Sequence, residues 1–72
     1  MKELYADFNN IETDGALSLA CVGSVASIAE LDEGLEVGED VLVTDGELRA
    51  RGRVSRRRDG LWEVEPGWTF VG

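Results

Sequence analysis

The sequence predicts a mainly β protein: a small, strongly bent barrel of five to six strands with one short helix around residues 24–31. Two observations favour this fold class. Apolar and polar residues alternate in several short runs, which is the pattern of strands with one buried face. Glycine-containing turns separate these runs, as in small barrels. With 72 residues, we expect a single domain, 1–72, stabilised by only a few kcal/mol.

The first third of the chain predicts two strands. Leu4, Ala6 and Phe8 alternate with polar residues, which indicates a strand. The run 16–22 alternates in the same way and predicts a second strand after a loop rich in turn-forming residues.

A short helix is expected next. Ser24 or Ser27 could begin a helix that continues to residue 31, because serine is a preferred helix-capping residue. One longer helix remains an alternative, since six residues also fit a single helical face: Leu17, Ala20, Cys21, Ser24, Ile28 and Leu31.

The second half of the chain predicts a three-stranded meander. The run 41–44 is a strand that turns back at Asp45-Gly46, a sequence suited to a two-residue type I′ turn. Closing the hairpin there sets Asp40 opposite Arg51 on the outer face and only apolar pairs on the inner face.

The following turn is expected at residues 58–60, as a three-residue loop with glycine in the left-handed position. This register sets Val54 opposite Val64 and Arg56 opposite Trp62, so that apolar residues again share one face.

Three further features complete the sheet. Gly52 faces inward in a long strand and marks a bend. Residues 65–67 predict a tight turn, and residues 68–71 a short last strand.

Residues 34–72 resemble SH3-like barrels. The segment 34–43 resembles the one that enters the central meander of those barrels, which implies that Val37 and Val41 cap the core. The turn 65–68 lies where they often have a one-turn 3₁₀ helix. The chain also resembles small uncharacterised bacterial proteins that end in a similar strand–turn–tryptophan pattern. The resemblance implies a binding role, since SH3-like barrels mostly bind peptides, nucleic acid or other proteins.

Composition limits both compartment and chemistry. A single cysteine, Cys21, excludes an internal disulfide and suits a reducing compartment; we expect it to be a small core residue. The longest uncharged run, 16–29, is shorter than a membrane span and is expected to be core. No secretory leader follows Met1, so we expect a cytoplasmic protein.

Catalysis and metal binding are not expected. The chain has no histidine, which removes the commonest general base and metal ligand, and it has no nucleotide-binding loop or zinc-ligand spacing. We therefore expect no enzyme activity, cofactor or metal. The acidic segment lacks the ligand spacing of a calcium loop and is expected to be a solvated loop: Asp32, Glu33, Glu36, Glu39 and Asp40.

Every positive charge except Lys2 lies within residues 49–58, although the net charge is −8. The candidate binding residues are this arginine run and the two tryptophans: Arg49, Arg51, Arg53, Arg56, Arg57, Arg58, Trp62 and Trp68. One reading is structural, with cross-strand pairs of Arg51 with Asp40, Arg53 with Glu65 and Arg56 with Trp62.

The functional readings differ in their partner. The favoured one is a small non-enzymatic module that binds another protein through the arginine strand, with an adjacent tryptophan as an apolar anchor. For this role we expect Trp62 to face inward and Trp68 to be the more exposed. One alternative is local nucleic-acid binding through the same strand and the 58–60 hairpin tip, which the net charge opposes. Another is an acidic inhibitor or immunity-type protein that acts through residues 32–40. An edge strand could also pair with a second copy of the chain.

Overall fold

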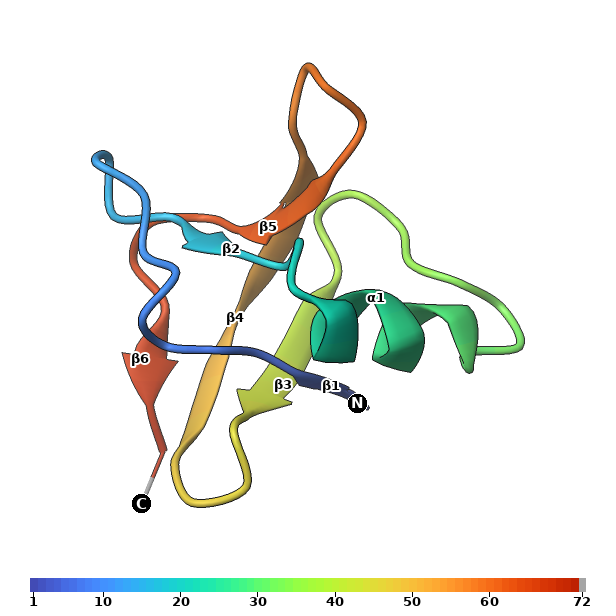
Figure 1. The fold of residues 1–72 in the computed structure, drawn as a ribbon, viewed down its shortest axis with the longest axis horizontal. Coiled ribbons are helices and arrows are strands. Elements are labelled where there is room, and N and C mark those ends of the chain that lie inside the picture. Colours follow the sequence, from blue (N-terminus) through green and yellow to red (C-terminus); the bar gives the residue numbers. More distant parts are fainter. Residues whose placement is uncertain (72) are drawn as a thin grey trace.

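The structure, a computed structural model, describes residues 1–71 and is mainly β (Figure 1). Six strands form one sheet in the order β1-β3-β4-β5-β2, with β6 also paired to β4, and one short helix packs beside it. The elements are β1 (Lys2–Tyr5), β2 (Leu17–Ser18), α1 (Val22–Ala29), β3 (Asp40–Thr44), β4 (Arg49–Arg56), β5 (Trp62–Val64) and β6 (Thr69–Phe70). The mainly β class with one short helix is confirmed. The sheet is not closed into a barrel, since no ladder joins β1 to β2 in the described chain.

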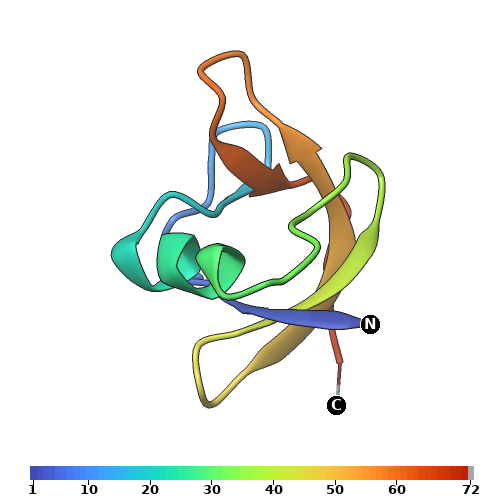
Figure 2. The same ribbon diagram turned by 90° about the vertical axis from the view of Figure 1, so that its right-hand side faces the viewer.

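The core lies in the concave side of the sheet, where β4 curves around it (Figure 2). Its fully buried residues come from every strand except β6 and from the loop segments beside β1 and β2: Leu4, Ala6, Leu17, Leu19, Val41, Val43, Ala50, Val54 and Val64. In β3 and β4 these residues alternate with exposed or half-buried ones, as the two-residue period requires. Val37 is 66% exposed, so the expectation that it caps the core is wrong; Leu35 packs against the core from the same segment instead.

The first hairpin closes with a four-residue loop, 45–48, and the predicted two-residue turn is wrong. Thr44 pairs with Arg49, so that the register is shifted by two residues and the same faces stay buried. The reason is the Asp45 side chain, which accepts hydrogen bonds from the backbone N–H groups of Glu47 (2.9 Å) and Leu48 (2.8 Å). A type I′ turn needs positive φ at both central residues, and only Gly46 has it.

The predicted register of the second hairpin, between β4 and β5, is confirmed. Arg56 pairs with Trp62 and Val54 with Val64 around a three-residue loop whose glycine, Gly60, has φ +87°. This placement follows from the G1-bulge geometry that a left-handed glycine allows.

β5 and β6 run along the same edge of β4, with two extra residues between them. From the Val54–Val64 pair to the Arg51–Thr69 pair, β4 advances three residues while the other strand advances five. The predicted tight turn at Pro66-Gly67 takes up the difference, with Gly67 at φ +100°. This bulge lies opposite Gly52.

Gly52 is required by that close approach. A Cβ atom there would overlap Cγ1 of Val64 and lie 2.8 Å from Cβ of Trp68. Because Val64 is fully buried, the neighbours have little room to move.

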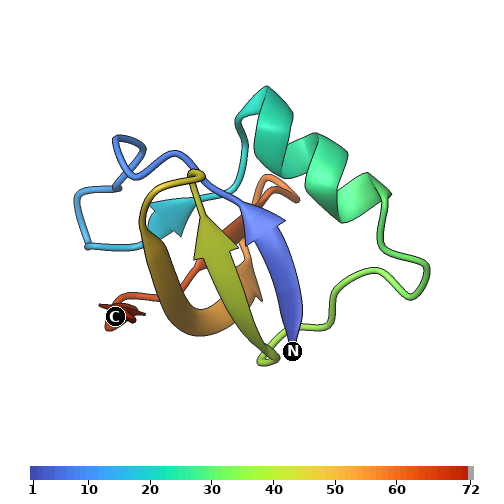
Figure 3. The same cartoon turned by 90° about the horizontal axis from the view of Figure 1, so that it is seen from below.

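The N-terminal half differs most from expectation. β2 is only Leu17–Ser18, and α1 begins one residue after Cys21, so Ser24 and Ser27 lie inside the helix and do not cap it. The single longer helix is also wrong. β1 pairs with β3 in parallel, and α1 packs beyond β1 (Figure 3).

Two serines join α1 to the free edge of β1. The Ser24 hydroxyl donates to the carbonyl of Tyr5 (2.6 Å), and the N–H of Tyr5 donates to the Ser27 hydroxyl (3.1 Å). These bonds satisfy edge groups that a further strand would otherwise use.

Candidate functional site

The outward side of β4 carries Arg49, Arg51 and Arg53, which we call the arginine face. These residues alternate with buried Ala50 and Val54, so the pleat turns all three guanidinium groups away from the core.

Two arginines of this face are paired with carboxylates. Arg49 lies 3.4 Å from Glu3 of β1, and Arg51 lies 3.6 Å from Asp40 of β3. The predicted Arg51–Asp40 contact is therefore confirmed, although the two residues are diagonal neighbours in the ladder. All four side chains are about half exposed, so each pair contributes only a few tenths of a kcal/mol.

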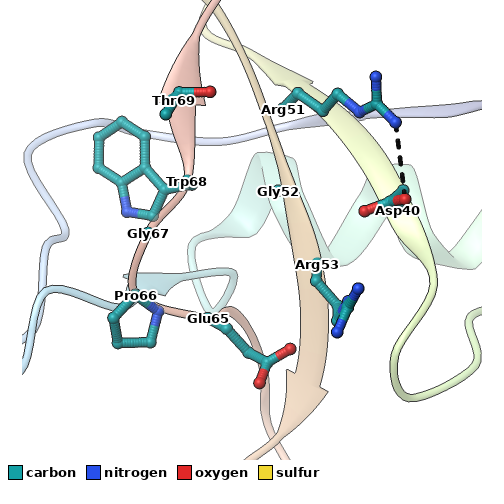
Figure 4. A pocket seen from close by; sticks show the side chains of 9 residues that line it. All are labelled: Asp40, Arg51, Gly52, Arg53, Glu65, Pro66, Gly67, Trp68 and Thr69. Carbon is teal, nitrogen blue, oxygen red and sulfur yellow. Dashed lines mark ion pairs between the residues drawn. The ribbon is translucent and has the colours of Figure 1, made fainter.

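Arg53 differs from its neighbours. The N–H of Glu65 donates to the carbonyl of Arg53 (2.7 Å), so the two residues face each other as expected. Their side chains form no ion pair, and residues 1–71 offer Arg53 no other (Figure 4). Its guanidinium is thus the one group on the arginine face left for an external carboxylate.

A shallow groove of about 370 Å³ lies between the arginine face and the bulged strand. Figure 4 shows Gly52 at its centre, Arg51 and Arg53 on β4, and Glu65 with the turn to Trp68 and Thr69 on the opposite side. Gly52 lies between the outward-facing side chains of Arg51 and Arg53, so that the β4 backbone lines this part of the groove. It combines guanidinium, carboxylate, hydroxyl and apolar groups.

At the hairpin tip, the charge of Arg57 is balanced by nearby carboxylates and that of Arg58 is not, within residues 1–71. Arg57 forms ion pairs with three carboxylates, those of Glu12, Asp59 and Glu63, the last two at 3.3 and 4.0 Å. Arg58 is exposed and has no ion pair in the described residues.

Arg56 stacks on Trp62, as predicted. Its guanidinium carbon is 4.9 Å from the ring centroid, and its Nε donates to the carbonyl of Gly60 (3.2 Å). The contact fixes both side chains at the open end of the core, where Trp62 is half-buried.

Trp68 is also half-buried and is held firmly. Its Nε1 donates to the carbonyl of Gly15 (2.9 Å), and its ring contacts Phe8 and Phe70 at centroid distances of 5.8 and 5.2 Å. Neither tryptophan is a free anchor. The most exposed aromatic residue among 1–71 is Phe70, at 56%, which the sequence analysis did not single out. Phe70 pairs with Ala50 of β4, so its side chain shares the inward face with Ala50 and lies on the side of the sheet opposite the arginine face.

The acidic segment 32–40 is held mainly near its C-terminal end, where Gly38 and Glu39 form backbone hydrogen bonds with Val54 and Asp40 begins β3, so it is not a solvated loop throughout as expected. Lys2 Nζ donates to the carbonyl of Gly34 (2.7 Å) and to Glu39 Oε1 (3.0 Å). The backbone N–H of Glu36 and the Lys2 ammonium hold the pKa of Glu39 below its ordinary value. No cluster of metal-ligand residues is found in residues 1–71.

Cys21 is not a core residue, contrary to expectation. It is the half-buried N-cap residue of α1, with its Sγ 3.1 Å from the Ser24 hydroxyl. Desolvation raises the pKa of the thiol, but hydrogen bonds from Ser24 and from the backbone of Ser24 and Gly23 outweigh it, so the pKa is lowered overall.

The outer side of α1 is uncharged and apolar, which corrects the expectation that the whole run 16–29 is core. Val22 is 88% and Val25 51% exposed, and Ala26 and Ala29 are exposed as well. The spacing of these four residues places them on one helical face, but spacing alone does not show which face is buried.

Comparison with protein-family models, curated proteins and solved structures finds no match for the chain. Within residues 1–71 no helix is both long and apolar enough to span a membrane.

Proposed function

We propose that this chain is a small, non-enzymatic protein-binding module that uses the arginine face and the groove beside it. The observation that supports this is Arg53: an exposed guanidinium without an ion-pair partner in residues 1–71, at the wall of a groove. The groove lining contains arginine and tryptophan, which are among the residue types enriched at binding hot spots.

The partner is expected to place a carboxylate against Arg53 and an apolar side chain against Pro66 and Trp68, which line the same groove. Arg49 and Arg51 contribute less, because their own carboxylates compete with those of the partner. The long, bent β4 supports kinship with SH3-like barrels as part of the same proposal, and the lone cysteine suits a cytoplasmic setting.

The test uses three baits that differ by one charge reversal. Wild-type, Arg53→Glu and Arg58→Glu proteins are incubated with lysate, with and without nuclease, and captured proteins are identified by mass spectrometry. We expect one protein to be held by wild type and Arg58→Glu and to fall about tenfold or more with Arg53→Glu. Equal capture by all three baits would contradict the proposal.

Nucleic-acid binding through the 58–60 tip gives the opposite pattern. Capture would then vanish with nuclease and depend on Arg58, the unpaired arginine at the tip. Nucleic-acid binding is the second candidate function, because Arg57, next to Arg58 in the chain, already faces three carboxylates.

A further inference from the structure

α1 turns most of its apolar residues toward solvent, unlike an ordinary surface helix. A surface helix usually turns its apolar stripe to the core and its polar residues to solvent. In α1 the only fully buried residue is Ser24, which together with Ser27 is hydrogen-bonded to the β1 backbone, and the half-buried Ile28 is the one apolar residue of α1 that packs against the core. The stripe at positions i, i+3, i+4 and i+7 faces outward instead, and it consists of Val22, Val25, Ala26 and Ala29.

This stripe adds little to the fold. A single exposed apolar residue is ordinary, but four on one helical face make a continuous patch. The helix carries no ionisable residue, in a chain where 31% of residues are charged. An apolar stripe that the core does not use is the form in which helices dock into a partner's groove.

The charges next to the stripe indicate the chemistry of that partner. Glu30 caps the C-terminal end of α1, and Asp32 and Glu33 follow it; all three are exposed, and none has an ion pair in the described part of the chain. The C-terminal end of a helix already carries partial negative charge, so these acids add to it. Lysine or arginine from a partner would be attracted to this end.

We propose that the outer face of α1 is a docking surface for a segment of another protein that presents an apolar face edged with lysine or arginine. The valines would enter the apolar part, and the acids after α1 would meet the basic edge. A second copy of the chain fits less well, because it would bring the same unpaired acids to the contact. The eight-residue helix is about 12 Å long, so the surface is smaller than that of a permanent complex and suits reversible binding.

The arginine face is not part of this surface. In Figure 2 α1 lies on the opposite side of the molecule from β4, so the two surfaces can be tested independently.

The test titrates the purified protein with a synthetic amphipathic helix of leucine and lysine, by isothermal titration calorimetry. We expect micromolar binding by wild type and a loss of at least about tenfold with Val22→Ser/Val25→Ser. Val37→Ser is the matched control, because Val37 is an exposed valine outside α1, and its affinity should equal that of wild type. Arg53→Glu should also bind as wild type does.

A second peptide, with glutamate in place of lysine, tests the charge. It should bind at least about tenfold more weakly than the lysine peptide, and Glu30→Gln/Asp32→Asn/Glu33→Gln should reduce the salt dependence of binding. Circular dichroism and thermal unfolding confirm that each variant is folded, which is expected because every substituted side chain is exposed.

Two results overturn the proposal. If Val22→Ser/Val25→Ser binds as tightly as Val37→Ser, the peptide is held by general charge and the stripe docks nothing. If wild type sediments as a dimer that Val22→Ser/Val25→Ser abolishes, the occupant is a second copy of the chain.

Discussion

The arginine face and the outer face of α1 differ in how their charges are satisfied. On β4 a dense row of guanidiniums faces Glu3 and Asp40, so most of its charge is cancelled within the molecule. On α1 there is no charge, but the acids that follow it have no ion pair in residues 1–71. The number of arginines therefore overstates how much positive charge the arginine face offers to a partner. The absence of charge on α1 makes its outer face easy to overlook as a binding surface. Charges without internal partners, and not their number, indicate where a partner can bind.

The largest difference in the free energy of unfolding is expected between two glycine-to-alanine substitutions, one in β4 and one in α1. Gly52→Ala should lower the free energy of unfolding by about 1–3 kcal/mol, because the new Cβ meets buried Val64 and the Trp68 Cβ. Gly23→Ala should leave it unchanged or raise it by up to about 1 kcal/mol, because alanine favours a helix. The Cβ there meets only the Tyr5 ring, 2.6 Å away, which is exposed enough to turn aside.

Urea unfolding followed by tryptophan fluorescence measures both variants. Equal destabilisation by Gly52→Ala and Gly23→Ala would show that α1 is packed as tightly as β4, and the contrast between the two regions would be lost.

A smaller effect is expected within the hairpin tip. Arg57→Ala should lower the free energy of unfolding by about 1 kcal/mol, because it removes the partner of three carboxylates that then repel one another. Arg58→Ala should change it by less than about 0.5 kcal/mol, since its side chain is exposed. Thermal unfolding at low and high salt separates the two, and a similar loss for both would mean that these ion pairs do not stabilise the fold.

The smallest effect is expected from acid. Hydrogen bonds from the N–H groups of Leu48 and Glu47 hold the pKa of Asp45 below its ordinary value of 3.8, and the pKa of Glu39 is below 4.5. In this range the unfolded chain binds more protons, so stability is complete above about pH 5 and falls as the pH drops through the folded pKa values.

Asp45→Asn and Glu39→Gln should each reduce the loss of thermal stability between about pH 5 and 3. Asp32→Asn, which removes one exposed carboxylate from the same acidic chain, is the control. If all three variants lose thermal stability with falling pH as steeply as wild type does, the carboxylates of Asp45 and Glu39 are not the cause of that loss.

Local features of the fold were predictable from the sequence. The two-residue period placed the strands at 41–44 and around Val54, and Gly60 specified the second loop and with it the Arg56–Trp62 contact. The first loop was wrong because a side chain, Asp45, satisfies two backbone N–H groups that turn propensity does not count.

Features that depend on distant segments were not predictable. Helical spacing alone could not show which face of α1 is buried, because Ser24 is held by Tyr5, 19 residues away in the chain. The same limit applies to the ion pairs of the candidate site. The Arg51–Asp40 pair lies within one hairpin and was predicted, whereas the Arg49–Glu3 pair joins residues 46 positions apart and was not.

The parallel pairing of β1 with β3 has a consequence for the kinetics of folding. Lys2 pairs with Val41, and β2 at Leu17 completes its ladder only with Val64. During synthesis the early strands must therefore wait until β5 has left the ribosome before the core can close. A domain with so many distant pairings is expected to fold in milliseconds to seconds, slowly for its size.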